Sequence, residues 1–153
     1  MKLVNESLNE LYKFQKKSNP LNSLGIGKKA LIKKWLHENR VTHCVINDDY
    51  NTINGTMWVD ISSKELTKIP DYIQFNIIEG SFFCMNNKLT SLKGCPKIVK
   101  GDFSCSINQL SNLEGCPLEV YGNFFAYGNK KQFTEEDVRK ICKVHKHILV
   151  TDM

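Results

Sequence analysis

Residues 80–121 read GSFFCMNNKLTSLKGCPKIVK and then GDFSCSINQLSNLEGCPLEVY, two consecutive copies of one 21-residue unit. The copies share Gly, Phe, Cys, Asn, two Leu, Gly-Cys-Pro and Val at equivalent positions. A third copy starts at Gly122 and breaks off near Phe133, and a degenerate earlier copy covers residues 57–70. A fixed period of this length predicts a solenoid of stacked turns.

The start of each unit predicts a short strand with one buried face. Phe82 and Cys84 alternate with other residues, as do their equivalents in the next copies, and this period of two is typical of a strand. Parallel stacking would place equivalent residues about 4.8 Å apart. We therefore expect an asparagine ladder that bonds to the backbone where the chain leaves the strand, made by Asn87, Asn108 and Asn129. Each Gly-Cys-Pro is predicted to form a turn.

The shared pattern, apolar-x-apolar-x-x-Asn-x-Leu-x-x-Leu, resembles the leucine-rich repeat family. The additional Leu-x-x-Leu-x-Gly-Cys-Pro segment is similar to a variant in leucine-rich-repeat-like proteins that bacteriophages and their bacterial hosts encode. The resemblance covers residues 56–132, roughly half of the chain. It implies a protein-binding scaffold, and a phage product that masks a host defence protein in the host cell cytoplasm.

The expected fold class is α+β, a short leucine-rich-repeat-like solenoid of three to four rungs within one compact unit. Residues 1–55 are expected to form an N-terminal cap subdomain, with helices over 3–15 and 28–39 and a hairpin made by 41–47 and 52–59. The repeat array occupies 56–132. Residues 133–153 are expected to form a C-terminal capping helix and a tail. Thr134 would be the N-cap of that helix, and Val138, Ile141, Cys142 and Val144 would form its apolar stripe.

Composition narrows the class of protein. The chain has 153 residues and is 41% hydrophobic and 24% charged, which is typical of a soluble globular protein. It contains no run of eighteen apolar residues, and its N-terminus becomes polar too early for a signal peptide. We therefore expect a cytoplasmic protein with no membrane partner, whose six cysteines stay reduced.

The cysteines do not follow the spacing of a metal site. Cys84 and Cys105 lie at one repeat position, Cys95 and Cys116 lie at another, and no Cys-x-x-Cys occurs. Zinc ligands usually come in close pairs, whereas a ladder aligns thiols in rows. No hydrolase or metalloprotease motif is present either. The sequence thus predicts a non-enzymatic protein with no metal and no cofactor.

Large apolar residues are expected on the outer face of the repeat strands, at the positions that alternate with the buried ones. The predicted protein-binding residues are Phe83, Met85, Phe125, Tyr127, Asp60 and Ser104, with Ser62 and Ser106 on the same face. Grouped exposed aromatics often mark a protein-binding patch. The alternative is that a terminal segment folds over this face and buries it.

Two further hypotheses concern other partners. Residues 1–40 contain nine Lys or Arg and three Asp or Glu, so the net positive charge belongs to this segment. Nucleic-acid binding would use the lysines of the predicted helices, which are Lys13, Lys16, Lys17, Lys28, Lys29, Lys33 and Lys34. The third hypothesis is symmetric self-assembly into a homo-oligomer, through an open solenoid end or the aromatic face.

Overall fold

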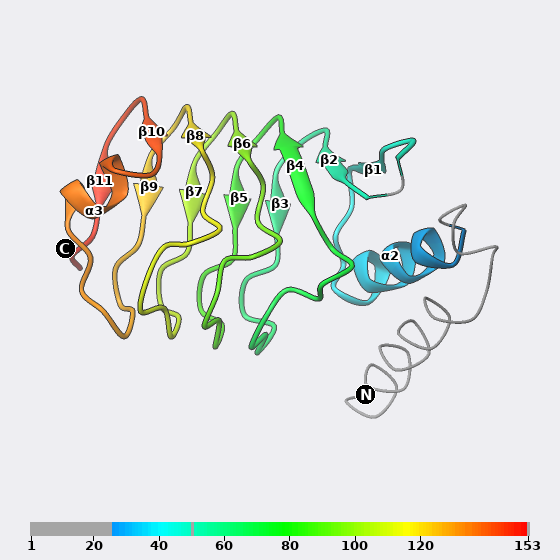
Figure 1. Cartoon of the computed structure of the whole chain (residues 1–153), viewed down its shortest axis with the longest axis horizontal. Helices are drawn as coiled ribbons and strands as arrows, with labels where there is room; N and C mark the ends of the chain where they lie inside the picture. Colours follow the sequence, from blue (N-terminus) through cyan, green and yellow to red (C-terminus); the bar gives the residue numbers. More distant parts are fainter. Residues whose placement is uncertain (1–25, 50, 153) are drawn as a thin grey trace.

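Each repeat contributes one short strand to each of two sheets, and the chain winds into a β-solenoid of about five turns (Figure 1), more than the three to four rungs expected from the sequence. The computed structural model describes residues 26–49 and 51–152. A six-stranded sheet has the order β1-β2-β4-β6-β8-β10, and a five-stranded sheet has the order β11-β9-β7-β5-β3. The strands of the six-stranded sheet are β1 (Cys44–Ile46), β2 (Ile53–Gly55), β4 (Phe75–Ile78), β6 (Ile98–Val99), β8 (Glu119–Val120) and β10 (Lys143–Val144). Those of the five-stranded sheet are β3 (Val59–Asp60), β5 (Phe82–Phe83), β7 (Phe103–Ser104), β9 (Phe124–Phe125) and β11 (Ile148–Leu149).

The register of the five-stranded sheet follows the sequence repeat. Phe82 is aligned with Phe103, and Phe103 with Phe124, in parallel pairs. Val59 of the degenerate copy is aligned with Phe82. Parallel stacking of the repeat strands is therefore confirmed. The six-stranded sheet is also parallel except for the β1–β2 hairpin, which confirms the hairpin prediction.

A column of phenylalanines fills the interior. Phe75, Phe82, Phe103 and Phe124 are all fully buried. Their ring centroids lie 5.1, 6.1 and 5.0 Å apart in that order, close enough for favourable aromatic contact. Trp35 extends the column at one end, with its ring centroid 6.4 Å from that of Phe75.

The asparagine ladder is confirmed by its hydrogen bonds. The side-chain amide of Asn108 donates to the carbonyls of Cys84 and Cys105, both at 3.0 Å. Its Oδ1 accepts from the N–H of Leu89 at 3.0 Å. Asn87 and Asn129 make the equivalent contacts one turn to either side. Each asparagine therefore ties its own turn to the preceding one.

The Gly-Cys-Pro turns have the expected backbone. Gly94 and Gly115 have φ angles of 97° and 89°, in the left-handed region that favours glycine. At the opposite corner, the N–H of Gly122 donates to the carbonyl of Gly101 at 2.9 Å. A Cβ on Gly122 would lie 2.6 Å from that carbonyl carbon, so the successive turns can approach this closely only with glycine.

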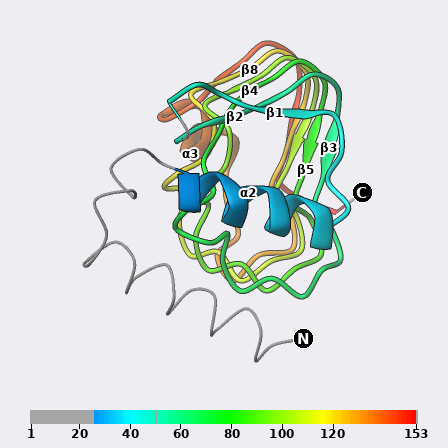
Figure 2. The same ribbon diagram turned by 90° about the vertical axis from the view of Figure 1, so that its right-hand side faces the viewer.

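Helix α2 (Ile26–Glu38) runs across one end of the solenoid, as the view along the solenoid shows (Figure 2). The helix predicted over 28–39 is confirmed, and Leu31, Ile32, Trp35 and Leu36 are buried against the core. The helix predicted over residues 3–15 lies outside the described residues. Within the described residues, no helix has the length and apolar character needed to cross a membrane.

At the other end, the helical prediction was only partly right. Thr134 caps helix α3 (Glu135–Arg139) through a capping box with Asp137, as expected. The helix ends at Arg139, however, and Ile141 is exposed rather than part of an apolar stripe. The chain instead resumes the repeat, because Val144 pairs with Val120 in the six-stranded sheet. Strands β10 and β11 thus continue both sheets beyond residue 132 (Figure 1).

Candidate protein-binding face

The outer surface of the five-stranded sheet carries two rows of side chains that alternate with the buried phenylalanines. The first row contains Phe83, Ser104 and Phe125, which are aligned on neighbouring strands. Phe83 and Phe125 are half-buried, whereas the neighbours that precede them, Phe82 and Phe124, are fully buried. The alternation that the sequence predicted therefore gives two partly exposed aromatic side chains on this face.

The second row lies where each strand passes into the asparagine turn. Backbone hydrogen bonds join Ser63 to Met85 and Ile107 to Tyr127, which place Met85, Ser106 and Tyr127 on successive turns. Met85 and Tyr127 are half-buried. In both rows, large side chains on the β5 and β9 turns flank a serine on the β7 turn.

The prediction that Ser104 offers a binding surface needs correction. Ser104 is only 4% exposed, and Ser106 in the adjacent row is fully buried. Neighbouring strands lie about 4.8 Å apart, so large side chains on both sides cover a small one between them. Alternation along one strand carries no information about the size of the neighbours on adjacent strands, and that size determines how exposed these serines are.

Two serine hydroxyls on this face lack a hydrogen-bond partner. Among the described residues, the Oγ atoms of Ser62 and Ser106 are buried without one. Both belong to the row of Met85 and Tyr127, Ser62 at its β3 end and Ser106 between the two large side chains. A buried hydroxyl without a partner costs free energy.

Asp60 lies at the edge of the face, on the last strand of the five-stranded sheet. Its side chain is exposed, and its Oδ1 accepts from the N–H of Ser62 at 2.8 Å. This contact holds the carboxylate beside the end of the strand. The predicted face therefore combines an apolar centre with one acidic residue at its edge.

The C-terminal segment does not fold over this face. Strand β11 pairs with β9 and lengthens the five-stranded sheet, with Leu149 aligned with Phe125. Helix α2 lies at the end of the solenoid (Figure 2). The other terminal segment that could cover the aromatic rows, residues 1–25, lies outside the residues that the structure describes.

The cysteines line the interior as unpaired thiols. Cys84, Cys95, Cys105 and Cys142 are buried, and no described cysteine forms a disulfide. Burial raises the pKa of the Cys95 and Cys105 thiols, which keeps them protonated. Because the thiolate is the nucleophile and metal ligand, a buried thiol with a raised pKa is a poor nucleophile and a poor metal ligand. Within residues 26–49 and 51–152, no three His, Cys, Asp or Glu side chains are grouped to hold a metal ion.

The predicted nucleic-acid lysines are only partly described. Lys28, Lys29, Lys33 and Lys34 lie on α2, whereas Lys13, Lys16 and Lys17 are outside the described residues. Lys28 donates to the Oδ1 of Asn51 at 2.7 Å, and Lys34 lies 3.7 Å from a carboxylate oxygen of Glu38. Lys28 and Lys34 thus already have polar partners on this chain.

A polar cluster on the six-stranded sheet was missed by sequence reasoning. The rings of Tyr121 and His145 stack with centroids 4.4 Å apart, and the Nζ of Lys100 lies 4.3 Å from the Tyr121 centroid. His145 also contacts a carboxylate oxygen of Glu119 at 2.8 Å. The signal was the repeat itself, because Lys100 and Tyr121 occupy equivalent positions one unit apart. Their contact across neighbouring strands could not be predicted, because the sequence analysis did not predict the six-stranded sheet that brings them together.

Comparisons with known protein families, with curated proteins and with solved structures gave no match for this chain.

Proposed function

We propose that the chain is a non-enzymatic protein-binding module that recognises its partner with the outer face of the five-stranded sheet. The observation that carries the proposal is the pair of adjacent rows containing Phe83, Met85, Phe125 and Tyr127, all half-buried on a parallel sheet. We call these four residues the aromatic face. Large aromatic and methionine side chains are enriched at the centres of protein interfaces.

The backbone beneath the aromatic face is held in place before any partner binds. The N–H groups of Cys84 and Cys105 donate to carbonyls one turn along, both at 2.9 Å. The asparagine ladder fixes the turn at the end of each strand. A partner that binds here would order few backbone groups, and this lowers the entropic cost of association.

The resemblance to phage-encoded repeat proteins supports a more specific form of the proposal. In it, the protein acts in the cytoplasm of an infected host cell and inhibits a host defence protein by masking its surface. Binding alone suffices for such inhibition, so a rigid face without a reaction centre fits this role.

The proposal is tested by affinity capture from host lysate with the full chain as bait. The test variant is Phe83→Ala/Phe125→Ala, and the matched control is Leu118→Ala/Ile141→Ala. Leu118 and Ile141 are exposed apolar residues outside the aromatic face, at 64% and 44% exposure. We expect the test variant to lose at least about tenfold of the captured partner, while the control retains it at both low and high salt. Equal capture by both variants would contradict the proposal.

Nucleic-acid binding through α2 and self-assembly give different results in the same experiment. Capture lost after nuclease treatment or at high salt would favour the basic helix, because phosphate contacts are strongly salt-dependent. Recovery of the bait alone, together with a larger mass in solution, would favour self-assembly.

A further inference from the structure

Residues of helix α2, of strand β1 and of the segment between them line a groove. Figure 2 shows α2 across this end of the solenoid. The volume of the groove is about 690 Å³. Leu36 and Val41 are buried residues of its lining, and Val45 is 53% exposed. The groove is distinct from the aromatic face, because none of its lining residues belongs to the five-stranded sheet.

The helix side of the groove is positively charged. Its lining includes Lys29, Lys33 and His37, which recur at helical spacing on α2, and Arg40, which follows the end of the helix. Within the described residues, the lining contains no Asp or Glu. Lys33 and Arg40 form no ion pair with any described residue. A ligand of the groove would therefore be expected to carry negative charge.

The strand side of the groove offers a sheet edge that no other described strand pairs with. Among residues 26–49 and 51–152, β1 is the terminal strand of the six-stranded sheet and pairs only with β2. On the β2 side, the carbonyl of His43 accepts a hydrogen bond from the N–H of Thr56, and the N–H of Asn47 donates to the carbonyl of Thr52. In an antiparallel pair the bonded residues alternate, so the backbone groups of Cys44 and Ile46 point to the opposite edge. Both residues line the groove.

We propose that this groove binds an extended peptide segment of a partner protein that adds a strand to β1 and places acidic side chains against Lys33 and Arg40. Backbone pairing with Cys44 and Ile46 supplies the contact that any extended peptide can make. Lys33 on α2 and Arg40 just after the helix select acidic side chains, and Val45 contacts the apolar ones between them. A free phosphate or a lone anion would use only the cations and leave the strand edge unpaired.

The charge of this chain's own N-terminal segment argues against it as the occupant. Residues 1–25 contain four lysines and two glutamates, so they carry the same sign as the groove. A partner with acidic residues complements the groove, whereas this segment does not.

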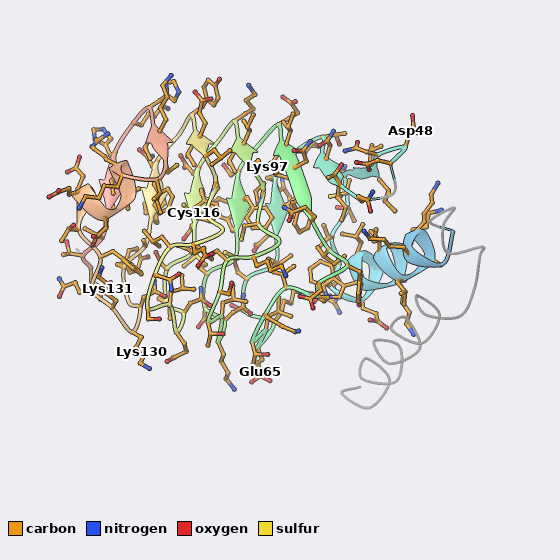
Figure 3. All side chains as sticks on the ribbon, in the orientation of Figure 1. Asp48, Glu65, Lys97, Cys116, Lys130 and Lys131 are labelled. Atoms are coloured by element: carbon orange, nitrogen blue, oxygen red, sulfur yellow. The ribbon has the colours of Figure 1, made fainter. Side chains whose placement is uncertain are left out.

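The proposal is tested first with a displayed library of random decapeptides, selected on the full chain. We expect enriched peptides to alternate acidic and apolar residues. The substitutions Lys33→Glu and Arg40→Glu together should weaken the binding of a synthetic enriched peptide by at least about tenfold. The matched control is Lys130→Glu/Lys146→Glu, two exposed lysines at the α3 end of the chain (Lys130 is labelled in Figure 3), and it should leave that affinity unchanged. No enrichment, or enrichment of basic peptides, would overturn the proposal.

The second measurement tests strand addition directly. Binding of the enriched peptide should slow hydrogen exchange at the amides of Cys44 and Ile46. The same peptide with alternate amides N-methylated should lose at least about tenfold in affinity. Equal binding of the methylated peptide, or protection confined to the aromatic face, would overturn strand addition at β1. Phe83→Ala/Phe125→Ala should not affect this binding, so failure here is separate from failure of the proposed function.

Discussion

Buried asparagine side chains satisfy the backbone where each repeat leaves the five-stranded sheet. Asn108 is 3% exposed and makes hydrogen bonds to the backbone of two successive turns. Backbone bonds such as that from the Ile107 N–H to the Tyr127 carbonyl continue into this bend, and the asparagine side chain supplies partners for backbone groups that these bonds leave out. The sequence predicted this role because an asparagine recurs at a fixed distance from the strand in the three copies that start at Gly80, Gly101 and Gly122.

Asn108→Ala should lower the free energy of unfolding by about 3 kcal/mol, because it leaves buried carbonyl and N–H groups without partners. Asn129→Ala should cost less, since Asn129 is only half-buried. Urea unfolding followed by circular dichroism measures both values. A loss below about 0.5 kcal/mol for Asn108→Ala, the range of an ordinary surface substitution, would contradict the ladder's role.

The serine in the row of Met85 and Tyr127 should behave in the opposite way. The Oγ of Ser106 is buried and has no partner among the described residues. Ser106→Ala removes that unsatisfied group, so we expect stability to be unchanged or to rise by up to about 1 kcal/mol. Thermal unfolding of the variant measures the change. A loss of more than about 1 kcal/mol would mean that the hydroxyl has a hydrogen-bond partner.

The pH dependence of stability should include a contribution from Glu119. Its hydrogen bond with His145, and then the nearby Lys143, hold the pKa of this carboxyl below its usual value of 4.5. A lowered native pKa stabilises the fold above the unfolded-state value and is lost as the pH falls through the native one. Melting temperatures between pH 6 and pH 3 should therefore fall less steeply in Glu119→Gln than in the parent chain. Identical slopes would contradict this contribution.

At the scale of elements, a strand could be predicted from the sequence only where apolar and polar residues alternate over more than two residues. Alternation marked β5, β7 and β9 because an asparagine turn continues the pattern after each of these three strands, whereas β11 lacks such a turn and lies in what was expected to be a tail. Strand β6 has two residues, of which Val99 is buried and Ile98 half-buried, so no apolar–polar alternation marks it. The six-stranded sheet was consequently not predicted. The groove was also beyond sequence reasoning, because it depends on the packing of α2 against the end of the solenoid.

Helix α3 was predictable from its N-terminal capping residues although it is short. The helix has five residues, and the side chain of Thr134 accepts from the N–H of Asp137 at 3.1 Å while Asp137 accepts from the N–H of Thr134 at 2.9 Å. Its N-terminus was predictable from this capping box, but its C-terminus was not. Val144 fits the apolar stripe of a longer helix and also a strand position, and the open edge of β8 provides partners for the strand.

Thr134→Ala should destabilise the α3 end by about 1 kcal/mol, the usual value of a lost N-cap. Hydrogen exchange should speed up within α3 more than in the central turns, because each turn of a solenoid contacts only its neighbours. Thr151→Ala, an exposed threonine close in sequence to β11, serves as the control. Faster exchange spread evenly over all turns would contradict a local effect.

At the scale of the whole molecule, the solenoid presents one rigid outer face that carries four large side chains. The sequence predicted the residues of the aromatic face, because the direction of strand side chains follows from alternation alone. It misjudged Ser104, since exposure depends on the neighbours that stacking brings to either side. The phenylalanine column from Phe75 to Phe124 connects the turns beneath the face, so the aromatic rows rest on a packed interior.

Site-specific photo-crosslinking is the most direct test of the aromatic face as the binding surface. p-Benzoylphenylalanine would be introduced at position 125, and in a separate chain at position 118, whose leucine is 64% exposed outside the face. Both chains would be irradiated in host lysate under the same conditions. We predict one strong crosslinked protein band from position 125 and none from position 118. Crosslinks of equal yield at both positions, or at position 118 alone, would contradict the central claim.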